Sequence, residues 1–246
     1  MIAFVASVTI VLFAAILVSA RRRRSYASAS LSLLAVAYAG VALASCFALW
    51  TIRGTFEELA RQGGGIGARS FGFWQAARVP LASAWIAVAA TLLALAIAFV
   101  SRREEEPATP WWQGGVAIAA GVTAVLVFRD MVEFAIDAVI PGRQPWWLTG
   151  PVSGYAINSR VVSAGAISAF CCAVALTLAV MMLRRGAPSR RMVVTMLIAS
   201  VVVSATLVAG LQSYTSRFHA TYSEGQPIVS SDHRQPIIDN RQLARR

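Results

Sequence analysis

Lysine is absent from this sequence, and all 22 basic residues are arginine. Without lysine, the chain cannot form a Schiff base with a carbonyl substrate, and it cannot build the lysine-containing loop that binds nucleotide phosphates. Charged residues are also scarce: they make up 13% of the chain, whereas a soluble domain carries roughly 25%. Hydrophobic residues make up 57% and come in long blocks, which indicates that lipid surrounds most of the chain.

Histidine and cysteine are rare, and neither is placed for metal or haem chemistry. Both histidines, His219 and His233, lie in the polar C-terminal segment, so no apolar block can hold a haem between two histidine ligands. Cys46, Cys171 and Cys172 lie inside apolar blocks and form no C-x-x-C pair or metal-ligand spacing. We interpret the cysteines as small buried hydrophobic residues and expect no cofactor and no bound metal.

Six apolar blocks reach the length of about 20 residues that a transmembrane helix needs. We therefore predict an all-α, polytopic integral membrane protein, a bundle of about six transmembrane helices that forms one domain over residues 1–212. The spans are predicted at about residues 2–20, 29–52, 79–100, 113–140, 161–183 and 192–211. A polar C-terminal tail over residues 213–246 follows the last span.

Arginines are concentrated in the short links at 21–24, 102–103 and 184–191. A signal peptide would carry its charge before its apolar run, so the first block is predicted to be an anchor helix. Short basic links stay in the cytoplasm. The sequence thus predicts three helical hairpins with their links inside and both termini outside, in a cell membrane that we expect to be the bacterial inner membrane.

The net charge of +11 would suggest nucleic-acid binding in a soluble protein. Here most arginines flank apolar blocks, a position that suits anionic lipid head groups and the control of topology. We therefore expect membrane lipids at the arginine-rich links, other membrane subunits or further copies of this chain as partners, and no nucleic acid.

Small residues four positions apart let transmembrane helices approach closely. Such pairs and triplets predict packing faces on four blocks, at Gly40 and Ala44, at Ala117 and Gly121, at Gly165, Ala169 and Ala173, and at Ser200 and Ser204.

Two charged segments are the candidate functional residues, as a charged contact or an ion path. At 100° per residue, the charges of the fourth block fall on one face: Arg129, Asp130, Glu133 and Asp137. The second block carries charges four residues apart: Arg53, Glu57 and Arg61. One interpretation is an amphipathic extension held by an Arg129–Glu133 pair at i,i+4 spacing. The others are an ion or proton path, or a polar contact with another subunit. We also predict that the two charged segments face each other.

Three classes of function stay open. The first is a non-catalytic integral membrane subunit or scaffold of a larger membrane complex, which the packing faces, the charged segments and the tail favour. The alternative is a transporter or an ion-channel or proton-channel component that uses the charged outer half of the fourth block. An enzyme is the least favoured class, because neither a metal-binding cluster nor a Ser-His-Asp set appears in the sequence.

Overall fold

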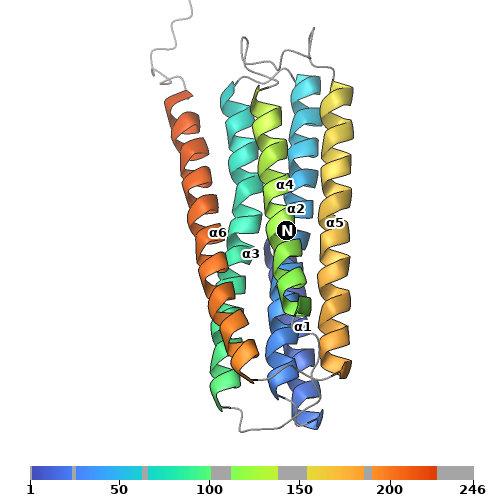
Figure 1. Ribbon diagram of the computed structural model, residues 1–246. Helices are drawn as coiled ribbons and strands as arrows, with labels where there is room; N and C mark the ends of the chain where they lie inside the picture. The colour runs from blue at the N-terminus through green and yellow to red at the C-terminus, as the bar shows by residue number, and fades with distance from the viewer. Residues whose placement is uncertain are drawn as a thin grey trace, which may run out of the picture.

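The computed structural model describes residues 2–23, 26–62, 66–100, 112–137, 154–185 and 190–225, and all of them are helical. The six helices follow one another as α1 (Ile2–Arg23), α2 (Tyr26–Gln62), α3 (Ile66–Val100), α4 (Trp112–Asp137), α5 (Gly154–Arg185) and α6 (Arg190–Gly225) (Figure 1). Five of them carry stretches long and apolar enough to cross a membrane, at Ala29–Thr55, Gly72–Phe99, Trp112–Phe134, Ser159–Arg184 and Arg191–Ser216. The predicted fold class is confirmed, and the chain is a multi-pass membrane protein.

The helices form a bundle of three antiparallel hairpins. α1, α3 and α5 finish at the same end of the bundle at which α2, α4 and α6 begin (Figure 1, bottom). We call this the link end, because the three arginine-rich links of the sequence connect the helices there, and we call the opposite end the far end.

α2 is the central helix of the bundle. It packs against α5, α3, α4 and α1. In its most apolar stretch 78% of the residues are buried inside the protein, compared with 28–44% in the other four spans. This stretch is rich in alanine and serine, whose short side chains let several helices approach one backbone at once.

α1 is a shorter helix that lies along the link-end half of α2. The Phe4 and Phe47 rings meet edge to face with centroids 5.9 Å apart. A Cβ on Gly40 would lie 3.0 Å from Thr9 Oγ1. Among the described residues, the apolar stretch of α1 covers Ser7–Val18. The whole helix is about 33 Å long, but its apolar stretch is shorter than those of the other five helices, so the structure supports five of the six predicted spans.

Several helices are longer than the predicted spans. α3 begins at Ile66 rather than near residue 79 and continues through Pro80. α6 continues to Gly225, so the predicted tail begins inside a helix, and residues 226–246 lie outside the described residues. Hydropathy detects only the lipid-facing length of a helix, and the polar residues beyond it still form helical hydrogen bonds in water.

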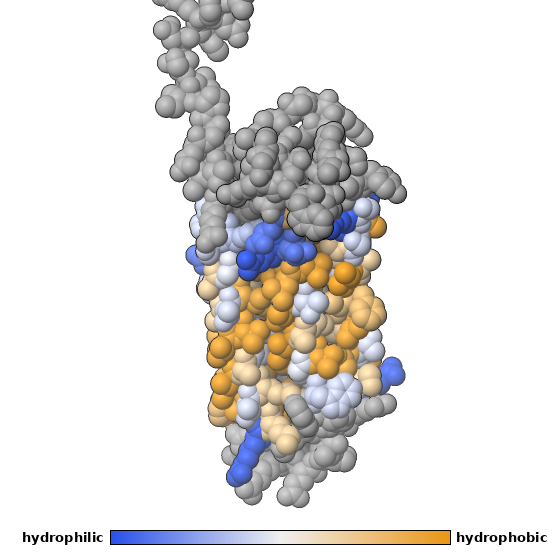
Figure 2. Space-filling model, turned by 45° about the horizontal axis from the view of Figure 1, so that its top comes forward, coloured by the Kyte–Doolittle hydropathy of each residue, from blue (hydrophilic) through white to orange (hydrophobic). Residues whose placement is uncertain are grey.

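On the face that Figure 2 shows, an apolar band covers the middle of the bundle, with hydrophilic residues toward both ends. Arg160 and Arg184, both exposed, lie near the two ends of the apolar stretch of α5. At 1.5 Å per residue they are about 36 Å apart, slightly more than a hydrocarbon core of about 30 Å. These arginines therefore mark the two membrane boundaries, one at the link end and one toward the far end.

Candidate functional site

An arginine belt marks the far boundary of the membrane. We use this name for four residues on four helices: Arg53, Arg78, Arg129 and Arg160. Three of the guanidinium groups lie over aromatic rings, Arg53 over Trp50 at 5.1 Å, Arg78 over Trp74 at 4.8 Å and Arg160 over Phe134 at 4.0 Å from the ring centroid. In each of these contacts the positive guanidinium group is attracted to the face of an aromatic ring.

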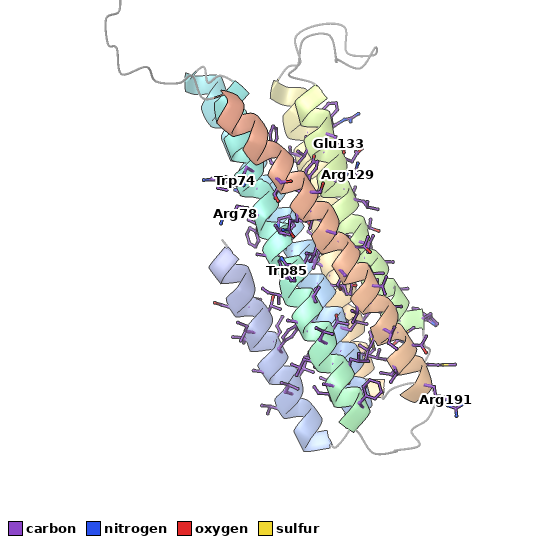
Figure 3. All side chains as sticks on the ribbon, turned by 90° about the vertical axis from the view of Figure 1, so that its left-hand side faces the viewer. Trp74, Arg78, Trp85, Arg129, Glu133 and Arg191 are labelled. Atoms are coloured by element: carbon purple, nitrogen blue, oxygen red, sulfur yellow. The ribbon has the colours of Figure 1, made fainter. Side chains whose placement is uncertain are left out.

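The fourth member of the belt pairs with a carboxylate instead of a ring. Arg129 Nε donates a hydrogen bond of 2.8 Å to Glu133 Oε1, and the two side chains are 61% and 47% exposed. Arg129 is about 26 Å from Trp112 along α4, close to the far edge of the hydrocarbon core. Figure 3 places this pair toward the same end as Trp74 and Arg78. The predicted i,i+4 pair is confirmed.

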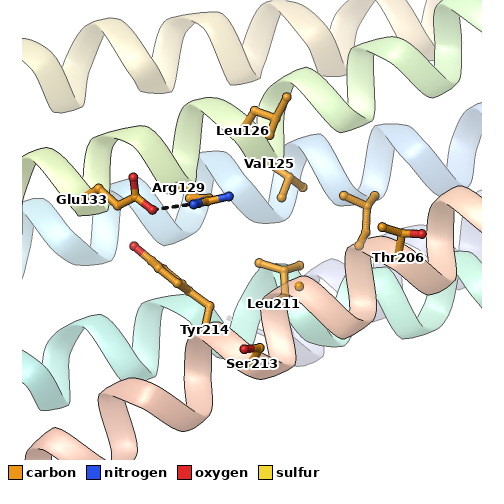
Figure 4. A pocket seen from close by; sticks show the side chains of 10 residues that line it. Val125, Leu126, Arg129, Glu133, Thr206, Leu211, Ser213 and Tyr214 are labelled. Carbon is orange, nitrogen blue, oxygen red and sulfur yellow. Dashed lines mark hydrogen bonds and ion pairs between the residues drawn. The ribbon is translucent and has the colours of Figure 1, made fainter.

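Arg129 and Glu133 line a groove of about 360 Å³ between α4 and α6 (Figure 4). The groove arises because α6 packs mainly against α3 and touches α4 at few points. Its α4 wall also includes Leu126, and its α6 wall includes Gly210 and Tyr214. The site therefore combines apolar and charged groups on a lateral surface of the bundle.

Asp130 lies beside this groove but does not line it. Its side chain is exposed, whereas the neighbouring Phe128, Met131 and Val132 are buried. At 100° per residue, Asp130 shares the outward face of α4 with the exposed Leu126. The carboxylate is thus directed away from its own bundle near the far membrane boundary.

The predicted contact between the two charged segments is described only in part. Arg53 is half-buried beside Trp50, while the side chains of Glu57, Arg61 and Asp137 lie outside the described residues. α4 meets α2 through Gly121, where an added Cβ would lie 2.5 Å from Tyr38 Cδ1. Arg129 and Glu133 border α6, on another face of α4. The contact between the segments stays a prediction.

The interior holds a cluster of hydroxyl groups, formed by Tyr38, Thr91, Ser200 and Ser204, all fully buried. The Tyr38 hydroxyl lies 3.0 Å from Ser204 Oγ and accepts a hydrogen bond of 3.2 Å from Ser200 Oγ. Thr91 Oγ1 lies 3.4 Å from the same Ser200 Oγ. The cluster joins α2, α3 and α6 through neutral groups that satisfy one another where no water is available.

The predicted packing faces form contacts within the chain on three helices, whereas the predicted face of α5 is not buried by the described residues and stays a prediction. Gly40 packs on Thr9, Gly121 packs on Tyr38, and both serines of α6 join the hydroxyl cluster. On α5, Ala169 and Ala173 are exposed, and a Cβ on Gly165 would meet nothing within 4 Å. The buried face of α5 carries Cys171, Cys172 and Ala175 instead, so the prediction that these two cysteines are buried is confirmed.

Sequence reasoning missed the arginine–aromatic contacts and the α6 side of the groove. Two of the arginine–aromatic contacts could have been predicted from spacing along one helix. Trp50 and Arg53 are three residues apart, and Trp74 and Arg78 are four residues apart. Gly210 and Tyr214 carry no such signal, because their role depends on which helix lies opposite α6.

Among the described residues, no group of three or more His, Cys, Asp or Glu side chains is placed to hold a metal ion. Comparison with models of protein families, with curated proteins and with solved structures finds no match for this chain.

Proposed function

We propose that this chain is a non-catalytic integral membrane subunit or scaffold of a larger membrane complex. We place it in the bacterial inner membrane, with the arginine-rich links in the cytoplasm beside anionic lipid head groups and both termini outside. Its partner is another membrane subunit or a second copy of the chain.

The observation that supports this proposal most directly is the position of Asp130. A carboxylate near the edge of the hydrocarbon core is unfavourable unless water or a complementary group satisfies it. Asp130 is directed away from the described part of its own bundle, so we expect its complementary group to come from a neighbouring subunit. The α4 face around Asp130 is then the expected contact surface.

The alternative is a transporter or a channel component that uses the same charges. A conducting path needs polar groups that line a passage through the membrane. Among the described residues, the buried polar groups of the mid-bundle cluster are neutral hydroxyls bonded to one another, and Arg129 and Glu133 lie on a lateral groove. This arrangement favours the subunit proposal.

The test is purification of the tagged full-length chain from its native host in a mild detergent, followed by mass spectrometry of the chains that co-purify. We expect a partner at fixed stoichiometry. The charge-only substitution Asp130→Asn should reduce its recovery by about fivefold or more, as expected for the loss of one charge-assisted contact. The matched control is Gln212→Ala, an exposed polar residue on α6 near the same boundary.

One outcome would contradict the proposal, and another would contradict only the place of Asp130 in it. A wild-type chain that purifies alone and conducts ions after reconstitution into liposomes would establish the alternative. If Asp130→Asn and Gln212→Ala reduce the recovery of the partner equally, Asp130 does not belong to the contact surface.

A further inference from the structure

We propose that the groove between α4 and α6 binds one phospholipid whose head group carries both a phosphate and a primary ammonium group, as in phosphatidylethanolamine. This inference concerns a ligand site and does not depend on the proposed subunit role. It rests on the shape of the groove, on the direction in which its polarity changes and on the pairing of charges at its outer end.

The groove is open space on the membrane-facing surface. A Cβ on Gly210 would meet no atom within 4 Å, so the α6 wall is hollow at this residue. Opposite it on α4, Leu126 is 55% exposed. Both residues lie within the apolar stretches of their helices. Lipid is therefore the medium that reaches the groove.

The polarity of the lining changes along the membrane normal. Leu126 and Thr206 lie in its inner part, toward the hydrocarbon core, while Arg129, Glu133 and Tyr214 lie toward the far end (Figure 4). Thr206 donates its hydroxyl hydrogen bond to the Val202 carbonyl of its own helix, so the inner part offers no charged group among its described residues. Along α4, Glu133 is about 10 Å farther out than Leu126. An amphiphile of the membrane has the same order, with an acyl chain inward and a head group outward.

The Arg129–Glu133 pair offers both signs of charge on one wall. Arg129 donates a hydrogen bond from Nε to Glu133 Oε1. Its two terminal amino groups carry further N–H donors, in the planar arrangement that binds phosphate oxygens. The second carboxylate oxygen of Glu133 can accept a hydrogen bond from an ammonium group. A zwitterionic head group therefore complements both residues at once.

The same chemistry discriminates among lipids. A choline head group has no N–H donor for Glu133. A glycerol head group leaves a net negative charge beside the Glu133 carboxylate, which is unfavourable at this short range. Phosphatidylethanolamine alone among these three satisfies Arg129 and Glu133 together.

The test uses full-length protein, purified in detergent, depleted of lipid and examined by native mass spectrometry. The probes are dioleoyl phosphatidylethanolamine, phosphatidylcholine and phosphatidylglycerol. We expect one molecule of phosphatidylethanolamine to bind about tenfold more tightly than the other two, as expected for one charge-assisted hydrogen bond. Glu133→Gln should abolish the preference over phosphatidylcholine, and Arg129→Gln should weaken the binding of all three lipids.

Gly210→Leu should lower phosphatidylethanolamine binding by about tenfold or more, because the side chain fills the groove. Gly165→Leu is the matched control, since that glycine also faces open space but lies on α5. Equal binding of the three lipids to the wild-type chain would overturn the proposal, as would wild-type binding by Gly210→Leu. Displacement of the lipid by inorganic phosphate would also overturn it and indicate a simple anion site. If a polypeptide co-purifies with the wild-type chain and is lost in Gly210→Leu, the groove binds a partner helix and not a lipid.

Discussion

At the scale of single residues, Tyr38 has the largest of the fully buried side chains that the structure describes. Its ring lies against Gly121 of α4, and its hydroxyl reaches the backbone carbonyl of Ser200 at 3.3 Å and Ser204 Oγ at 3.0 Å. Lipid cannot replace these hydrogen bonds, because the hydrocarbon core contains no water. One side chain of α2 thus fixes the positions of α4 and α6.

The substitution Tyr38→Phe should therefore lower the free energy of unfolding by about 0.5–2 kcal/mol, the range typical of hydrogen bonds between transmembrane helices. Reversible unfolding in mixed detergent micelles measures this change. Thr177→Val is the control, because the Thr177 hydroxyl is exposed and bonds only the Ala173 carbonyl of its own helix. Equal destabilisation by the two substitutions would show that the hydroxyl cluster does not hold the helices together.

At the scale of helices, the apolar spans could be predicted because their length and hydropathy are local properties of the sequence. The Arg129–Glu133 pair could be predicted for the same reason, since i,i+4 neighbours meet on any helix. The groove around that pair could not be predicted, because Gly210 and Tyr214 belong to another helix and their position depends on how α6 packs. Contacts between near neighbours on one helix could be predicted from the sequence, whereas the packing of one helix against another could not.

The buried face of α5 shows the same limit. Ala173 and Ala175 are two residues apart in one apolar run, yet Ala173 is exposed and Ala175 is fully buried. In water, polar residues would mark the exposed face, but in lipid both faces are apolar and carry small residues. The four-residue spacing of Gly165 and Ala169 therefore lies on a face of α5 that the other described helices do not bury.

This pair of alanines gives a direct test of the packing. Ala175→Leu should destabilise the bundle by about 1–3 kcal/mol, because added methyl and methylene groups overpack a filled interior. Ala173→Leu places the same atoms in lipid and should change the free energy of unfolding by less than about 0.5 kcal/mol. Thermal unfolding in one detergent, followed by the loss of the folded monomer, compares the two variants. A larger effect of Ala173→Leu would reverse the assignment of the α5 faces.

At the scale of the whole molecule, arginines gather near both membrane boundaries. The far boundary carries the arginine belt, and the link end carries Arg184 and Arg191 among the described residues. A count of basic residues alone therefore does not set the orientation. The two ends differ in kind: three members of the belt lie over aromatic rings within helices, while the arginines of the link end adjoin short connections. The positive-inside rule acts through such short connections and through the first helix, which ends at Arg23.

We therefore expect the link end in the cytoplasm, and labelling of introduced cysteines tests this in intact cells. Cys46, Cys171 and Cys172 are first replaced by alanine, which suits their apolar surroundings. Gln62→Cys, at the far end of α2, should then react with a membrane-impermeant maleimide from outside.

Glu105→Cys, in the arginine-rich link between α3 and α4, should react only after the cells are permeabilised, because a short basic link resists transfer across the membrane. The reverse pattern would invert the orientation and leave the bundle itself unchanged. A helix that spans the bilayer has its two ends on opposite sides of the membrane. Reaction of both cysteines from outside would therefore contradict the membrane crossing of α3 as well as the orientation. The stretch Gly72–Phe99 is apolar and long enough to cross a hydrocarbon core of about 30 Å, so we expect the two labels to stay on opposite sides.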